Sequence, residues 1–115
     1  MSVVLTSNAK EYANKFDELA DKARYLLSSQ ILADSNRYAR MDTGELIFSS
    51  QRASDLPKGQ LVWDTPYARR VYFTGTPSHD RNPYAELMWV TVAVDRHRND
   101  WITLFENLAR KEVLE

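Results

Sequence analysis

The sequence predicts an α+β domain in which a long N-terminal helix and a C-terminal helix pack on a small antiparallel β-sheet. Two observations lead to this prediction. Apolar residues recur at helical spacing over residues 8–36 and again from Leu87 onward. All three glycines and all four prolines lie between residues 44 and 83, where short apolar segments alternate with turn residues. Helix, small sheet and helix in this order are typical of α+β domains.

The first predicted element is the long helix over residues 8–36. No proline or glycine interrupts residues 1–43, so nothing in the local sequence ends this helix early. At about 1.5 Å per residue it would be about 43 Å long, which is comparable to the diameter of a domain of this size. We therefore expect the helix to project beyond its own core or to pack on a neighbouring chain.

Two strands are predicted next, Glu45–Gln51 and Gln60–Asp64. In the second, Leu61 and Trp63 share one face because successive side chains of a strand alternate. The segment between the two strands, "ASDLPKG", is rich in turn residues. These features predict an antiparallel hairpin.

After the hairpin, "TPYARRVYF" is either a short helix or an irregular strand. Thr65 is a suitable N-cap and Pro66 suits the first helical position. The following "TGTPSHDRNP" is predicted to be an exposed loop. The last third is helical, with Asp95 as a candidate for a kink or break, and its apolar positions are Leu87, Val90, Val94, Trp101, Leu104, Phe105 and Leu108.

Length and composition indicate a single domain spanning residues 1–115, with an ordinary soluble composition of 43% hydrophobic and 27% charged residues. The formal net charge of −1 gives no reason to expect a nucleic-acid or membrane partner. The chain has no cysteine, which excludes a disulfide scaffold, a thiolate zinc site and a cysteine nucleophile. No segment approaches the ~20 apolar residues of a membrane helix, and the N-terminus lacks the basic region of a signal peptide.

The residues Asp42, Thr43 and Gly44 spell the tripeptide in which aspartic proteases present their catalytic carboxylate. A dimeric protease of that class needs two such loops emerging from an all-β body, so that two carboxylates can share a proton. A chain that is about half helix does not supply that body. The alternative interpretation is a structural corner, in which Asp42 or Thr43 accepts hydrogen bonds from nearby backbone N–H groups and Gly44 permits a sharp change of direction from helix to strand. We favour the corner and predict that the protein is not an enzyme.

Other chemistry has weak signals. His79 lies next to Asp80 and His97 lies near Asp95. Such pairs are compatible with a metal site or with a catalytic base that a carboxylate orients. With one histidine in each segment, surface histidines explain the pattern better. No glycine-rich phosphate loop is present, and no cofactor is expected.

Three short motifs, taken together, resemble those of a known family. The first is D-T-G-x-L-x-x-S, the second is P-Y-A followed by a glycine, and the third is N-P followed by a tryptophan-containing helix. They comprise Asp42, Thr43, Gly44, Leu46, Ser49, Pro66, Tyr67, Ala68, Gly75, Asn82, Pro83 and Trp89. In this order they resemble the minor capsid proteins of long-tailed phages and prophages of Gram-positive bacteria, and the wider group of phage tail-completion (head–tail joining) proteins. The resemblance spans about residues 8–110, but Glu45 stands where the family usually has a small or basic residue.

The resemblance implies a structural virion protein without a cofactor. Such proteins form a homo-oligomeric ring, commonly a hexamer, in the neck that joins the DNA-filled head to the tail. The implied partners are a stopper or connector, a tail terminator and the tail tube, with no membrane and no specific nucleic acid. The implied location is the head–tail junction of the virion, after assembly in the host cytoplasm. Our candidate interface residues are Tyr72, Phe73, Thr76, His79, Arg81 and Tyr84.

The main competing hypothesis is the dimeric aspartic-protease-like enzyme with Asp42 in its active site. A small regulatory DNA-binding protein is a third alternative, but the sequence shows no basic recognition helix.

Overall fold

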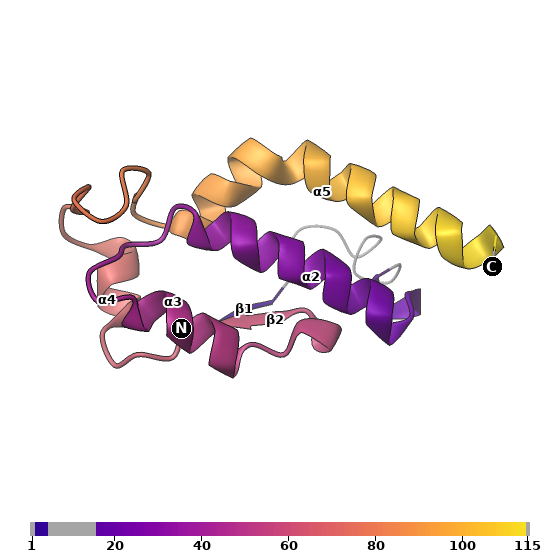
Figure 1. Ribbon diagram of the computed structural model, residues 1–115, viewed down its shortest axis with the longest axis horizontal. Coiled ribbons are helices and arrows are strands. Elements are labelled where there is room, and N and C mark those ends of the chain that lie inside the picture. The colour runs from indigo at the N-terminus through magenta and orange to yellow at the C-terminus, as the bar shows by residue number, and fades with distance from the viewer. Residues whose placement is uncertain (1, 5–15, 115) are drawn as a thin grey trace.

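The computed structural model describes the backbone of residues 2–4 and 16–114 and the side chains of residues 16–111. Figure 1 shows the arrangement of the elements. In chain order they are β1 (Ser2–Val4), α2 (Asp21–Asn36), α3 (Glu45–Ala53), the short 3₁₀ helix η1 (Leu56–Lys58), β2 (Gln60–Val62), α4 (Ala68–Phe73) and α5 (Trp89–Leu114).

The structure is mostly helical, with 62% helix, and the predicted α+β arrangement of helices on an antiparallel sheet is wrong. The main cause is the segment predicted as the first strand, which forms helix α3 instead. Its apolar run is short, and such a run cannot be assigned to a strand or a helix by periodicity alone. In the folded chain Leu46, Ser49 and Ser50 are buried while Glu45 and Phe48 are exposed, which is the spacing of a helix.

The second predicted strand exists but has a different partner. β2 pairs in antiparallel fashion with β1, with Leu61 opposite Val3, so the predicted hairpin is wrong. The predicted alternation is confirmed, because Leu61 and Trp63 are fully buried and Val62 is half-buried. The pairing partner lies at the N-terminal end of the chain, far from β2 in sequence, which a local pattern does not reveal.

The single N-terminal helix over residues 8–36 is also wrong. Residues 16–18 are helical, the backbone is extended at Ala20, and α2 begins at Asp21. Residues 8–15 lie outside the described part of the chain. The Arg24 guanidinium donates to the Asp17 backbone carbonyl at 2.9 Å and pairs with the Asp21 carboxylate. These contacts span the bend at residues 19–20, and they stabilise a helix start that has no glycine or proline signal.

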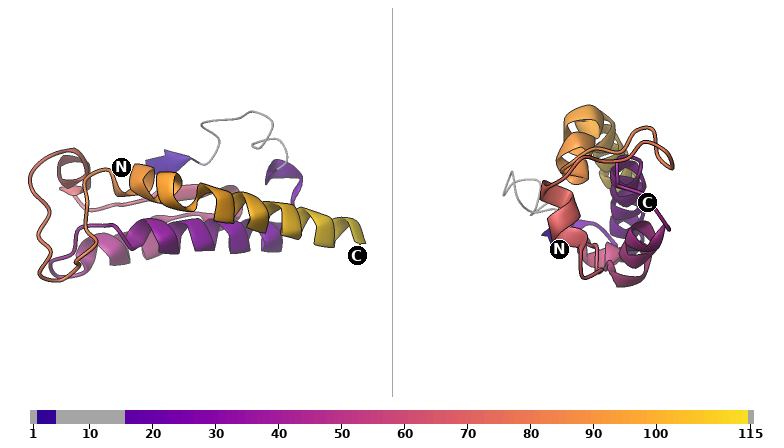
Figure 2. Two further views of the ribbon diagram at one scale, coloured as in Figure 1. Left: turned by 90° about the horizontal axis from the view of Figure 1, so that it is seen from above. Right: turned by 90° about the vertical axis from the view of Figure 1, so that its left-hand side faces the viewer.

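Helix α5 confirms the predicted C-terminal helix. It is continuous from Trp89 to Leu114, so Asp95 marks no break. Helix α2 lies between α5 on one side and the layer of α3, η1 and β2 on the other (Figures 1 and 2). The molecule measures 46 × 24 × 22 Å. The start of α3, helix α4 and the loop that follows it lie together at one end of the long axis (Figure 1).

The core lies mainly along the buried side of α2. In the described part of the predicted apolar stripe, Phe16, Leu19, Ala23, Leu27 and Ile31 are buried as expected, whereas Ala20 and Leu26 are exposed. The α5 side chains pack against it from one side, and Trp63 and Tyr72 close the end near α4. The main core residues of α2 and α5 are Ala23, Leu27, Ile31, Leu32, Val90, Ala93, Trp101 and Phe105.

Candidate functional site

The Asp-Thr-Gly tripeptide forms a corner between two helices. Gly44 has φ of +90° and is the residue immediately before α3. The Glu45 backbone N–H donates to the Thr43 hydroxyl at 3.4 Å, and the Phe48 N–H donates to the Gly44 carbonyl at 2.9 Å. The expected change of direction at Gly44 is therefore present, but the chain continues into a helix and not into a strand.

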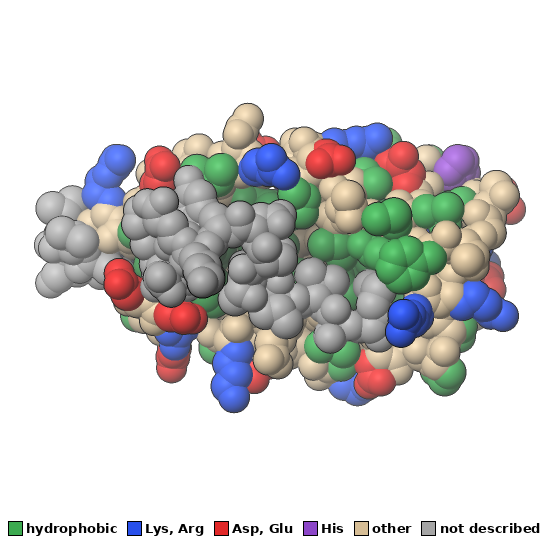
Figure 3. Space-filling view, turned by 180° about the vertical axis from the view of Figure 1, so that it is seen from behind, with side chains coloured by type: hydrophobic (Ala, Val, Ile, Leu, Met, Phe, Trp, Pro, Cys, Tyr) green, Lys and Arg blue, Asp and Glu red, His purple; other side chains and the backbone are tan. Residues whose placement is uncertain are grey.

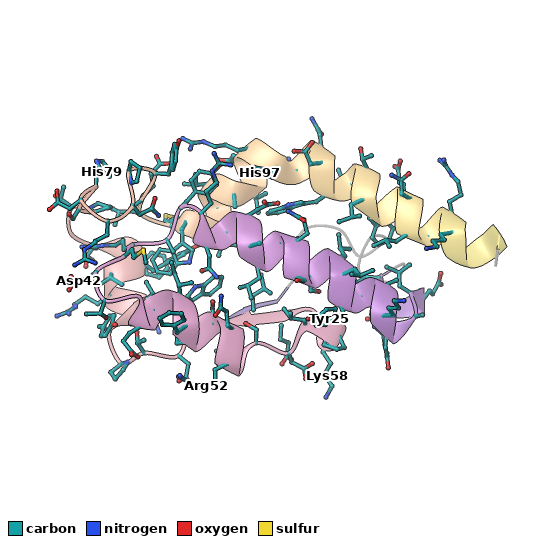
Figure 4. All side chains as sticks on the ribbon, in the orientation of Figure 1. Tyr25, Asp42, Arg52, Lys58, His79 and His97 are labelled. Atoms are coloured by element: carbon teal, nitrogen blue, oxygen red, sulfur yellow. The ribbon has the colours of Figure 1, made fainter. Side chains whose placement is uncertain are left out.

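Asp42 lies on the surface of this corner, at the end of the molecule (Figure 4). Its carboxylate forms no hydrogen bond or ion pair with another described residue. We therefore expect Asp42→Asn to change the free energy of unfolding by no more than about 0.5 kcal/mol, the usual range for exposed positions. Urea denaturation followed by circular dichroism measures this change. A loss above 2 kcal/mol would show that the carboxylate supports the corner, in contradiction to its exposure.

Under the corner, buried polar groups join α3 to the strand layer. The Ser49 hydroxyl donates to the Leu46 carbonyl at 2.6 Å and accepts from the Asp64 N–H at 3.0 Å. Beside it, the Asn36 side-chain amide donates to the Ser50 hydroxyl and accepts from the Trp63 indole N–H, both at 2.9 Å. The sequence motif included Ser49. It did not indicate Asn36 or Ser50, whose role depends on contacts distant in sequence.

Ser49→Ala is expected to lower the free energy of unfolding by about 1–3 kcal/mol, because it leaves the backbone N–H of Asp64 without an acceptor beside a buried side chain. Ser29→Ala, at a half-exposed position of α2, is the matched control and should change stability by about 0.5 kcal/mol or less. Equal midpoints for the two variants in chemical denaturation would contradict a structural role for Ser49.

The second motif forms the start of helix α4. The Ala68 N–H donates to the Thr65 carbonyl at 3.2 Å, and Ala68 is fully buried. This resolves the alternative of helix or irregular strand in favour of a helix. Pro66 and Tyr67 lie on the surface.

Arg40 ties the end of α4 to the corner. Its guanidinium donates to the carbonyls of Val71 at 3.1 Å and Thr74 at 2.7 Å, where the partial negative charge of a helix C-terminus favours a cation. A Cβ atom on Gly75, which has φ of +84°, would lie 3.2 Å from the Arg40 Nη1 atom. The glycine of the second motif therefore permits both the turn and the close approach of Arg40.

The third motif binds the backbone that leads into the same corner. The Asn82 side-chain amide donates to the carbonyls of Arg37 at 2.9 Å and Ala39 at 2.8 Å. Two residues of the following segment also pair with backbone groups, since the Glu86 N–H donates to the Tyr38 carbonyl and the Met88 N–H to the Tyr72 carbonyl. The three motifs, separate in the sequence, thus meet at one end of the molecule.

An aromatic cluster lies where the motifs meet. The rings of Tyr72 and Trp89 are 4.5 Å apart, and those of Trp63 and Trp89 are 5.8 Å apart, both pairs nearly perpendicular. Such edge-to-face pairs are favoured by the aromatic quadrupole. Tyr72 is buried, so its inclusion among the candidate interface residues is corrected. The other five candidates, Phe73, Thr76, His79, Arg81 and Tyr84, are exposed.

Both histidines form contacts within the fold. His97 lies within 2.8 Å of the Tyr38 hydroxyl through its Nε2 atom and stacks on Trp101. The Nε2 atom of His79 is 3.1 Å from the Ala85 carbonyl. His79 lies near the exposed loop and His97 lies on α5, so they are well apart (Figure 4). Among the described residues, no three His, Cys, Asp or Glu side chains come close enough together to hold a metal ion.

A groove of about 660 Å³ opens beside the corner. It is lined by residues 40–46, by Tyr67 and Val71 on one side of α4, and by Ser78. Apolar side chains also gather on the face seen from behind, toward the end that carries α4 (Figure 3). Apolar surface and a groove without a cluster of reactive side chains are typical of a docking surface.

None of the described helices is long and apolar enough to cross a membrane. Comparison with protein-family models, with curated proteins and with solved structures found no match to this chain.

Proposed function

We propose that this protein is a structural component of a phage neck, a subunit of a ring, commonly a hexamer, that joins the head connector to the tail tube. The proposal begins from the resemblance of the three motifs to minor capsid and tail-completion proteins. The observation that supports the proposal best is that the three motifs are joined by hydrogen bonds and ring contacts. Asn82 binds the backbone beside the first motif, Arg40 binds the helix of the second, and Trp89 packs on Tyr72.

The surface supports the same proposal. Among the residues whose side chains the structure describes, eight large hydrophobic side chains are exposed. Six of them belong to residues 41–88, namely Met41, Phe48, Tyr67, Phe73, Tyr84 and Met88. Exposed apolar groups concentrated in this way mark protein–protein contacts. The stopper or connector, the tail terminator and the tail tube are the proposed partners.

The aspartic-protease alternative gains no support from the geometry. Asp42 precedes a helix, whereas a protease dyad needs loops held by a β body so that two carboxylates can share a proton.

Disruption of the gene in the phage or prophage genome that carries it tests the proposal. After induction, electron microscopy should show DNA-filled heads and free tails in place of joined particles. Expression of the wild-type chain from a plasmid should restore joining, and mass spectrometry should then detect the chain in purified virions. Joined, infective particles in normal number from the disrupted genome would overturn the proposal.

A further inference from the structure

The groove at the Asp-Thr-Gly corner combines apolar walls with acidic charge. Met41 and Tyr67, each 37% exposed, belong to its lining, together with the carboxylates of Asp42 and Glu45. Neither carboxylate forms an ion pair with a described residue. The one guanidinium in the lining, that of Arg40, is already engaged by two backbone carbonyls. The groove therefore presents two free carboxylates beside exposed apolar surface.

The other side of α4 has the opposite character. Residues two apart on a helix point about 200° away from each other, so Arg69 and Phe73 lie opposite Tyr67 and Val71, which line the groove. Phe73 is 51% exposed, and its ring centroid lies 4.8 Å from that of Tyr72 with the two rings nearly perpendicular. Arg69 is four residues before Phe73 and therefore lies beside it on the helix surface. Arg70 follows Arg69, and neither arginine forms an ion pair with a carboxylate of the described residues. We call Arg69, Arg70 and Phe73 the basic ridge. At about 100° per residue, Arg69 and Phe73 face away from the groove and Arg70 lies between the two sides of the helix.

We propose that the basic ridge of one copy of this chain docks in the acidic groove of a second copy. Phe73 enters between Met41 and Tyr67, and the two arginines of the ridge face Asp42 and Glu45. The inference rests on the proposed function, of which it names the subunit interface. Aromatic and arginine side chains are the usual anchors of such interfaces, and the opposite charges of the two surfaces align and steer the copies.

The geometry also determines the kind of assembly. Because groove and ridge lie on opposite sides of α4, the contact joins two different surfaces and is heterologous. Each docked copy keeps one free groove or one free ridge, so the contact repeats, and it forms a ring when the rotation between copies closes. An isologous dimer would instead require groove and ridge to lie on one face, so that each ridge meets the partner's groove across a two-fold axis.

Charge reversal tests the pairing. The double variants Asp42→Lys, Glu45→Lys and Arg69→Glu, Arg70→Glu are compared with wild type by sedimentation velocity of the purified full chain over a range of concentrations. We expect the wild type to associate, and each double variant to raise the dissociation constant at least tenfold. A 1:1 mixture of the two variants should restore association, because it unites a native groove with a native ridge and two reversed surfaces with each other. The control, Glu106→Lys, Arg110→Glu, reverses one charge of each sign at exposed positions of α5 and should associate like wild type.

Removal of the aromatic anchor gives a second readout. Phe73→Ala should weaken association at least tenfold, whereas Tyr25→Ala, which truncates a similarly exposed aromatic on α2, should not. Circular dichroism confirms that each variant is folded. A wild-type chain that stays monomeric, or variants that associate like wild type, would overturn the interface. Particles that fail to join after gene disruption would then still support the proposed function, with its contacts elsewhere on the chain.

Discussion

Replacement of Trp63 by alanine is expected to lower the free energy of unfolding by about 3–5 kcal/mol, the usual loss for a large buried aromatic. Trp63 is fully buried, its ring meets Trp89 edge to face, and its indole N–H donates to Asn36. The substitution removes the side chain that links the strand layer to α5 and to the end of α2. Since domains are stable by about 5–15 kcal/mol, much of the Trp63→Ala protein should be unfolded under mild denaturing conditions.

Two further variants separate packing from hydrogen bonding at this position. Trp63→Phe keeps an aromatic ring but leaves the Asn36 carbonyl oxygen without its donor, so a smaller loss of about 1–3 kcal/mol is expected. Tyr25→Ala, an exposed aromatic of α2, should cost about 0.5 kcal/mol or less. Urea denaturation monitored at 222 nm measures all three. A Trp63→Ala protein within 1 kcal/mol of wild type would show that this tryptophan is not central to the core.

Gly44→Val is expected to lower the free energy of unfolding by about 2–3 kcal/mol. The backbone there has φ of +90°, a region that β-branched residues adopt only under strain. A Cβ atom at this position would also lie 3.0 Å from the Phe48 ring, but that ring is exposed and can move aside. The unfavourable backbone geometry is therefore the larger cause.

The double variant Gly44→Val, Phe48→Ala separates the two causes, because it removes the ring and keeps the strain. We expect it to remain destabilised by at least about 2 kcal/mol relative to Phe48→Ala alone. Gly44→Asn should lose less stability than Gly44→Val, because asparagine adopts positive φ more readily. Thermal melts of Gly44→Val, Phe48→Ala, the double variant and Gly44→Asn measure these differences in stability. A double variant that melts at the same temperature as Phe48→Ala alone would attribute the effect to the clash.

Several parts of the candidate site were predictable because they depend on local chemistry. The glycine at the corner and the burial of Leu61 with Trp63 each follow from a residue and its immediate neighbours. The predicted N-cap at Thr65 and first helical position at Pro66 are wrong, because α4 begins at Ala68 after Tyr67 and has no side-chain cap. Phe73 and Tyr84, which were candidate interface residues beside the predicted loop, are exposed. Tyr72 was placed on the surface incorrectly, because its ring packs on Trp89, a residue of another helix.

The sequence by itself determined that helices lie before and after a turn-rich middle and which apolar positions of these segments are mostly buried, since helical and strand periodicities are local. The tertiary structure decided the rest. Residues 45–53 form a helix because Ser49 and Ser50 find partners in Asp64 and Asn36, and β2 pairs with β1 at the N-terminal end of the chain. The bend before α2 depends on Arg24 reaching the carbonyl of Asp17. Hydrogen bonds between distant segments leave no periodic signal, so only the folded chain shows which of several locally allowed conformations they stabilise.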